Sequence, residues 1–176
     1  MIIPFIEQKA EKLLKESQLM SAPVDVFKCA EFSKVDVQPV VFDDDTISGL
    51  FVIKDKLAFI RYNQNDNELR QRFTVAHELG HFFLHSKETP LFLDTTEKVM
   101  YRNIESSTGD KAKEREANAF AAALLMPKMM IISEASKWNE DPSKDIVSEL
   151  ANQFKVSQQA MNFRLLNLGL LEFGLF

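Results

Sequence analysis

Residues 73–85 read FTVAHELGHFFLH, and the motif within them indicates the class of protein. It contains His77-Glu78-Leu79-Gly80-His81, an H-E-x-x-H motif inside a segment with the apolar spacing of a helix. Positions i and i+4 of a helix lie one turn apart on one face, so the imidazoles of His77 and His81 can converge on one zinc ion. Glu78 lies about 100° further round, where a general base can take a proton from water. A glycine inside the motif leaves room for another element to approach.

The third histidine, His85, lies eight residues after His77 on nearly the same helix face. Eight residues of helix rise about 12 Å, so one ion cannot bind both ends of that span while the helix is intact. We therefore expect His85 at the end of the helix, or behind a metal-bound imidazole that it orients, and not on the metal.

A zinc site of this kind needs a third protein ligand, and with no further histidine in the chain it should be a carboxylate. The segment 114–127, EREANAFAAALLMP, offers Glu114 and Glu116. Glu114 shares a helix face with small residues suited to close packing and with Asn118, whose amide can orient a metal-bound imidazole. Glu114 is therefore the favoured ligand, and Glu116 is the alternative.

Composition limits the class of protein. The 176 residues include 21 Lys and Arg against 26 Asp and Glu, a net charge of −5, which argues against a protein that coats nucleic acid. The single cysteine, Cys29, excludes a disulfide framework and any metal site of several thiolates. The N-terminus carries charges where a signal peptide needs an apolar stretch, and the longest apolar run, 119–126, is far short of a membrane span. We expect a cytoplasmic protein with no membrane partner.

The rest of the chain predicts one α+β domain. Helical spacing predicts helices over residues 4–18 and 23–32, and two-residue alternation predicts about three antiparallel strands, the first at an edge because it contains Pro39. These strands should pack against the helix over 66–85, and the next segment, 86–110, is expected to be irregular. The strands and later helices are predicted at 35–41, 50–53, 57–62, 110–127, 128–137, 143–154 and 158–168.

Together, the two motifs resemble the ImmA/IrrE family of zinc metallopeptidases, and the similarity extends to Pro23-Val24-Asp25 and to residues 150–169. The resemblance implies a zincin-like, gluzincin-type domain in which His77, His81 and a glutamate of the second motif hold zinc and Glu78 is catalytic. We expect a single domain over 1–176, made of N-terminal helices and a small sheet (1–65), zinc-site helices with the loop between them (66–127) and a helical C-terminal part (128–176). The resemblance also implies cleavage of a helix-turn-helix repressor, a separate protein, to switch on stress or mobile-element genes.

A competing interpretation comes from residues 151–160, which have the spacing of a helix-turn-helix, with Lys155 where a turn glycine is usual. The second helix of this unit, 158–168, has one basic residue, Arg164. One cation is too few for phosphate contacts, so we expect these helices to pack on the domain and not to bind DNA.

The mechanism expected is hydrolysis by a zinc-activated water whose proton Glu78 takes and later passes to the leaving amine. An extended substrate is expected to add as a strand at a sheet edge near residues 57–62. The loop over 86–110 is a candidate lid. Further donors to the developing oxyanion are to be sought among Tyr62, Tyr101, Arg102 and His85. The alternative function is a zinc-binding sensor that docks a repressor or DNA without efficient cleavage.

Overall fold

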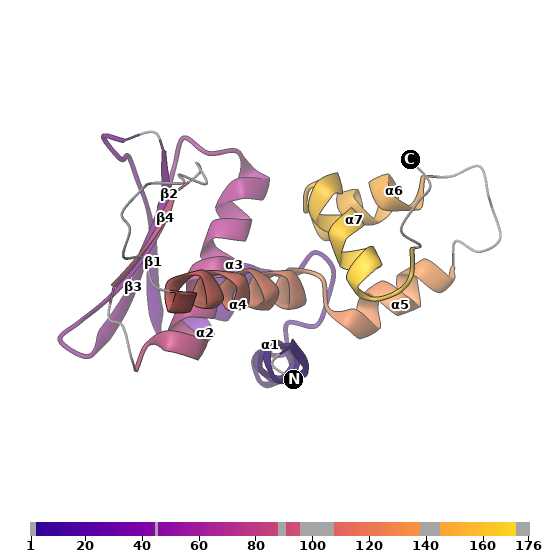
Figure 1. The fold of residues 1–176 in the computed structure, drawn as a ribbon, viewed down its shortest axis with the longest axis horizontal. Coiled ribbons are helices and arrows are strands. Elements are labelled where there is room, and N and C mark those ends of the chain that lie inside the picture. Colours follow the sequence, from indigo (N-terminus) through magenta and orange to yellow (C-terminus); the bar gives the residue numbers. More distant parts are fainter. Residues whose placement is uncertain (1–2, 45, 88–90, 96–107, 138–144, 172–176) are drawn as a thin grey trace.

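The computed structural model describes residues 3–44, 46–87, 91–95, 108–137 and 145–171, and within them a small sheet stands beside a group of helices (Figure 1). The helices α2, α3 and α4 lie on one side of the sheet, and α5 to α7 form a second group beyond α4. In chain order the elements are α1 (Ile3–Ser17), α2 (Val26–Phe32), β1 (Val35–Val40), β2 (Ile47–Lys54), β3 (Leu57–Asn63), α3 (Glu68–His85), β4 (Leu91–Thr95), α4 (Thr108–Leu125), α5 (Lys128–Ser136), α6 (Ile146–Phe154) and α7 (Gln158–Asn167).

The sheet has the strand order β1-β3-β2-β4. The predicted α+β class and the hairpin of β2 and β3 are confirmed, and β1 is an edge strand, as its proline predicts. Two details differ from the prediction. The segment expected to be irregular contributes a fourth strand, β4, which pairs antiparallel with β2, and β1 pairs parallel with β3. Alternation of apolar residues can indicate a strand, but it does not indicate which strand lies beside it or in which direction. The pattern therefore predicted neither the pairing of β4 with β2 nor the parallel pairing of β1 with β3.

The strand β3 lies inside the sheet. Its Ile60 is paired with Val37 of β1 on one side and with Phe51 of β2 on the other. The expectation that residues 57–62 present an exposed edge is therefore wrong, because the parallel β1 covers the side of β3 that the hairpin leaves open. In the described sheet, the edges are β1 and β4.

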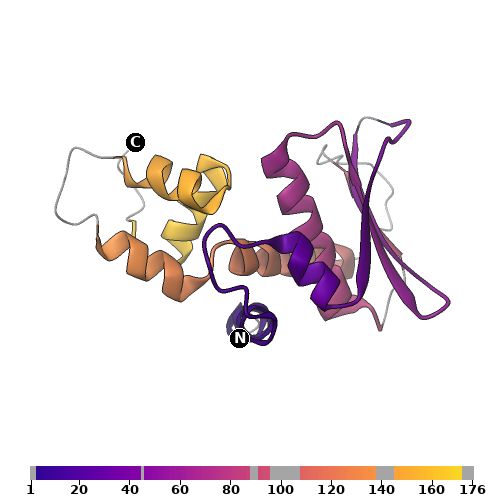
Figure 2. The same ribbon diagram turned by 180° about the vertical axis from the view of Figure 1, so that it is seen from behind.

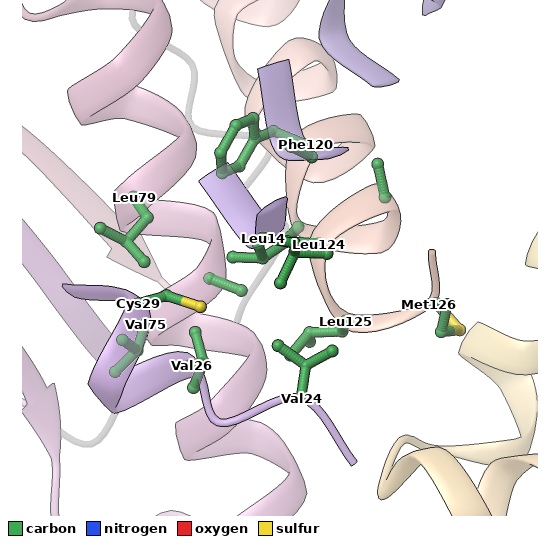
Figure 3. Packing of buried hydrophobic residues seen from close by; sticks show 14 of the residues in the cluster. Leu14, Val24, Val26, Cys29, Val75, Leu79, Phe120, Leu124, Leu125 and Met126 are labelled. Atoms are coloured by element: carbon green, nitrogen blue, oxygen red, sulfur yellow. The ribbon is translucent and has the colours of Figure 1, made fainter. Parts of the chain in front are cut away.

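The hydrophobic core lies where α1, α2, α3 and α4 meet (Figure 3). Leu14 of α1, Leu79 of α3 and Leu124 of α4 are buried there, together with the thiol-bearing Cys29 of α2. Burial raises the pKa of the Cys29 thiol to about 12, so the group is an uncharged part of the core. The core fixes α3 against α4, the two helices that carry the predicted metal ligands.

The C-terminal helices are joined to the rest of the protein by two buried arginines. Arg164 of α7 donates from Nε to the carbonyl oxygen of Met126 at 2.9 Å and pairs with the carboxylate of Glu7 on α1. Arg72, at the start of α3, donates to the carbonyl oxygens of Val24 at 3.0 Å and Lys155 at 3.2 Å. Buried guanidinium groups need such partners, so both arginines hold the second group of helices in place.

The turn between α6 and α7 has two local features that are usual in a helix-turn-helix. Lys155 occupies the left-handed region at φ 50° and ψ 57°, the conformation for which a glycine is usual there, and Ser157 caps α7 by accepting from the amide of Ala160. Among the described residues, no single helix has the length and apolar composition to span a membrane. The pair α4 and α5 meets that test only when taken together, and the chain bends by 49° between them.

Candidate metal centre

Three side chains from α3 and α4 converge at one point. The Nε2 atoms of His77 and His81, one turn apart on α3, lie 3.0 Å from each other. Glu114 of α4 reaches both, with one carboxylate oxygen 3.3 Å from His77 Nε2 and the other 3.2 Å from His81 Nε2. The histidines are buried, whereas the Glu114 side chain is 47% exposed, so the cluster opens to solvent on the side of the carboxylate.

The spacing of these atoms suits one small cation. Two ligands that bind zinc at about 2.0–2.1 Å with tetrahedral angles lie about 3.3 Å apart, close to the separations found here. Two imidazole nitrogens and a carboxylate oxygen are also a donor set that zinc takes in catalytic sites, where the fourth position stays open. One ligand atom from each of the three residues lies within 4.8 Å of the others. The residues present therefore fit zinc.

The protonation of the cluster also favours a cation. Burial raises the pKa of Glu114, but hydrogen bonds and the attraction of His77 and His81 outweigh burial and bring the pKa down to about 2. Burial lowers the pKa of His81, because the charged ring is disfavoured away from water. At neutral pH the cluster thus contains an ionised carboxylate and a neutral imidazole, the forms that bind metals.

Each histidine of the pair is held from behind by a different partner. The Nδ1 atom of His77 lies 3.0 Å from Oδ1 of Asn118, which follows Glu114 by one turn of α4. The Nδ1 atom of His81 lies 3.1 Å from Nδ1 of His85, at the last residue of α3. Asn118 and His85, which the sequence offers as residues that could orient the two imidazoles, thus each lie against one ring of the pair.

Glu116 lies outside the convergent cluster. Its carboxylate oxygen is 2.9 Å from Nε2 of His85, on the far side of that ring from His81. Of the two carboxylates that the sequence left open, the structure thus brings Glu114 to the histidine pair and Glu116 to His85.

Glu78 is fully buried and faces the sheet. An ideal Cβ at Gly49 of β2 would lie 3.6 Å from Oε1 of Glu78 and 2.3 Å from Cγ2 of Thr74, one turn earlier on α3. A side chain at position 49 would therefore collide with α3, and glycine lets β2 approach the H-E-x-x-H helix closely. The strand predicted from the sequence begins only at residue 50 and leaves Gly49 out. A glycine inside an apolar strand pattern was the signal that could have identified this contact.

The four residues proposed as donors to the oxyanion differ in where they lie. The ring of Tyr62 on β3 packs edge-on against Phe27 of α2, with 5.6 Å between ring centroids. Tyr101 and Arg102 lie outside the described residues, as does most of the segment predicted to be a lid. His85 is engaged by His81 and Glu116.

A mixed α+β domain in which an H-E-x-x-H helix lies against a sheet and meets a glutamate from a second helix defines a class, the metallopeptidases. Comparison with known proteins identifies the family. The family model for the IrrE N-terminal-like domain, a peptidase family, matches residues 30–166, and the chain belongs to this family. The matched region begins in α2 and ends in α7, so it includes the sheet, both metal-site helices and the C-terminal helices.

Two curated proteins are similar to the chain. The metallopeptidase ImmA of Bacillus subtilis (strain 168) is 29% identical over 105 residues, which cover 60% of this chain. The chain spans only about half of that relative, 54% of its length. An immunity region protein of Bacillus phage phi105 is 26% identical over 126 residues, covering 72% of this chain and 71% of the relative.

Proposed function

We propose that the protein is a zinc-dependent endopeptidase with His77, His81 and Glu114 as the metal ligands. The convergence of two imidazole Nε2 atoms and one carboxylate at separations of 3.0–3.3 Å carries this proposal. The membership in a peptidase family supports it independently.

The chemistry is divided among a few side chains. Zinc, when bound, supplies a Lewis acid that polarises the scissile carbonyl and acidifies a water molecule. Glu78 is the general base: its carboxylate accepts the proton of the attacking water and later delivers it to the leaving amine. Asn118 and His85 orient the two histidines from behind. The buried position of Glu78 between α3 and β2 keeps bulk water away from this proton transfer.

The substrate we propose is a helix-turn-helix repressor, bound in extended form at a sheet edge. The phage relative, which belongs to an immunity region by its name, supports a repressor as the target. Of the two edges, we favour β4, because it pairs with β2, the strand whose Gly49 lies against Glu78. The other edge, β1, contains Pro39, which has no amide hydrogen to donate to an added strand.

The test compares wild type with Glu78→Gln, each loaded with zinc and incubated with the repressor-like proteins encoded beside its gene. We expect wild type to produce two fragments by mass spectrometry, and Glu78→Gln to keep one zinc per chain while cleavage falls by about 10²–10⁴-fold, the usual contribution of a general base. His77→Ala is the matched control for the metal and should lose both zinc and cleavage.

Two results would count against the proposal. Zinc retained at full stoichiometry by both His77→Ala and His81→Ala would refute the ligand assignment. Binding of a repressor by wild type and Glu78→Gln alike, with no cleavage by either, would replace the peptidase with a zinc-binding sensor.

A further inference from the structure

A row of three side chains runs from the metal cluster to the second glutamate of α4. His81 contacts His85 through their Nδ1 atoms at 3.1 Å, and His85 contacts Oε2 of Glu116 through Nε2 at 2.9 Å. The two imidazoles are buried, and the Glu116 side chain is 27% exposed. Water therefore has little access to the contact between His81 and His85 or to that between His85 and Glu116.

The chemistry of the outer member decides where the protons lie. An ionised carboxylate can only accept, so Nε2 of His85 carries the hydrogen and donates it to Glu116. A neutral imidazole with its hydrogen on Nε2 has a bare lone pair on Nδ1. The contact between the two Nδ1 atoms is then a hydrogen bond only if His81 donates. This leaves a lone pair on Nε2 of His81, the atom that faces His77 and Glu114.

We propose that Glu116 is a positioning residue that acts through His85 to hold His81 in its Nδ1-protonated form, the form that binds a metal through Nε2. The inference rests on the proposed function, since it concerns a ligand of that same site. It gives a new role to a carboxylate that sequence reasoning had considered only as a ligand.

The two ligand histidines are supported unequally. His77 donates to a neutral amide, Asn118, whereas His81 donates into a row that ends in a full negative charge. The hydrogen bond from His85 to the carboxylate of Glu116 is of the charge-assisted kind, about twice as strong as a neutral one, and it polarises His85 so that its Nδ1 accepts more strongly from His81. A more strongly held Nδ1 hydrogen makes Nε2 of His81 a better donor to the metal. The contribution of His81 to metal affinity thus depends on a residue that does not touch the metal.

The experiment measures zinc affinity by competition with a chelator for wild type, Glu116→Ala, Glu116→Gln and a surface control, Glu31→Ala. We expect Glu116→Ala to bind zinc about 10–100-fold more weakly, the usual loss when such a partner is removed. Glu116→Gln should lose less, because its amide oxygen still accepts from Nε2 of His85. Glu31, an exposed residue of α2, should have no effect.

A double variant separates a role through His85 from a general effect on the fold. In the His85→Ala background, Glu116→Ala should cause no further loss of zinc affinity, because the row is already broken. An equal loss in both backgrounds would overturn the proposal, and so would a folded Glu116→Ala that binds zinc as tightly as wild type.

Nitrogen-15 NMR of the zinc-loaded wild type gives a readout that needs no variant. We expect the ring of His85 to carry its proton on Nε2 and that of His81 on Nδ1. A proton on Nδ1 of His85 would overturn the assignment even if Glu116→Ala fails to fold. Wild type that binds no zinc would refute the proposed function and this inference together, whereas normal binding with unchanged Glu116 variants would refute this inference alone.

Discussion

Gly80 of α3 lies directly against Ala117 of α4: a Cβ atom at position 80 would be 2.9 Å from the Cα atom of Ala117 and 3.0 Å from its carbonyl oxygen. Gly80 directly precedes His81, and Ala117 lies between Glu114 and Asn118, which contacts His77. The distance between the two helices at this point therefore sets the distance between the histidine pair and Glu114.

The variant Gly80→Ala should lower the free energy of unfolding and weaken zinc binding. Alanine is the better helix former by about 0.5–1 kcal/mol, but forcing a methyl group into a closed contact costs about 1–3 kcal/mol, so the clash prevails. Urea unfolding of the metal-free protein and chelator competition measure the two effects. Because the clash is with backbone atoms, Ala117→Gly should not restore either quantity. A more stable Gly80→Ala would show that the contact can relax.

Removing one partner of the buried pair of Glu7 and Arg164 should lower the free energy of unfolding substantially. Glu7→Gln removes the negative charge that faces the guanidinium of Arg164, which is 5% exposed, and leaves one oxygen able to accept from it. Loss of a partner from a buried pair costs about 3–5 kcal/mol, and we expect the lower end because the Glu7 side chain is 24% exposed.

Urea unfolding measures this loss, and the exposed pair of Lys12 and Glu16 on α1 provides the control. Lys12→Ala should change the free energy of unfolding by less than about 1 kcal/mol, as is usual for surface pairs. The double variant Glu7→Gln with Arg164→Met should be less destabilised than the sum of its single changes. Strict additivity would show that the two side chains do not interact.

Acid should destabilise the metal-free protein through His81. Its pKa lies below the ordinary value of 6.5 because burial disfavours the charged ring. As the pH falls through about 6.5, the unfolded chain therefore binds a proton at His81 more readily than the folded protein does. The contribution of His81 to the free energy of unfolding is thus full above that pH and declines as the pH falls. Urea midpoints at about pH 7.5 and pH 5.5 should differ less for His81→Gln than for wild type. Identical pH dependence in the two proteins would contradict this assignment.

The helix-turn-helix spacing of α6 and α7 should confer no DNA binding. Arg164, the one basic residue of α7, is occupied by Glu7 and by the carbonyl oxygen of Met126, and Lys155 of the turn pairs with Glu68 of α3 at 3.0 Å. Too few cations remain in this unit to replace the counterions of a phosphate backbone. Fluorescence anisotropy with duplex DNA at low salt should show no salt-dependent binding, and a steep salt dependence would refute this view.

The parts of the molecule that were predictable from sequence depend on local geometry. The spacing of His77 and His81 on one helix face, and of Glu114 and Asn118 on another, follows from 3.6 residues per turn alone. The helices and the hairpin follow from periodicity in the same way.

The parts that were not predictable depend on how distant segments meet. The parallel pairing of β1 with β3 places a strand 20 or more residues away in sequence against the expected edge, with Val35 opposite Ala58. The contact of His85 with Glu116 likewise requires the crossing of α3 and α4, which no pattern within either helix encodes. Long-range packing, and not residue type, determined both outcomes.

The hydrogen bonds of Arg72 determine how short a fragment of the protein can be while α3 stays folded. This side chain leaves α3 and ends on carbonyl oxygens of Val24, before α2, and of Lys155, after α6. A fragment that begins after Val24 or ends before Lys155 would lack one of these acceptors and leave the buried guanidinium of Arg72 without a hydrogen-bond partner there. A deletion series should therefore lose soluble, zinc-binding protein at these two positions, well outside the stretch from His77 to Asn118 that contains the chemistry.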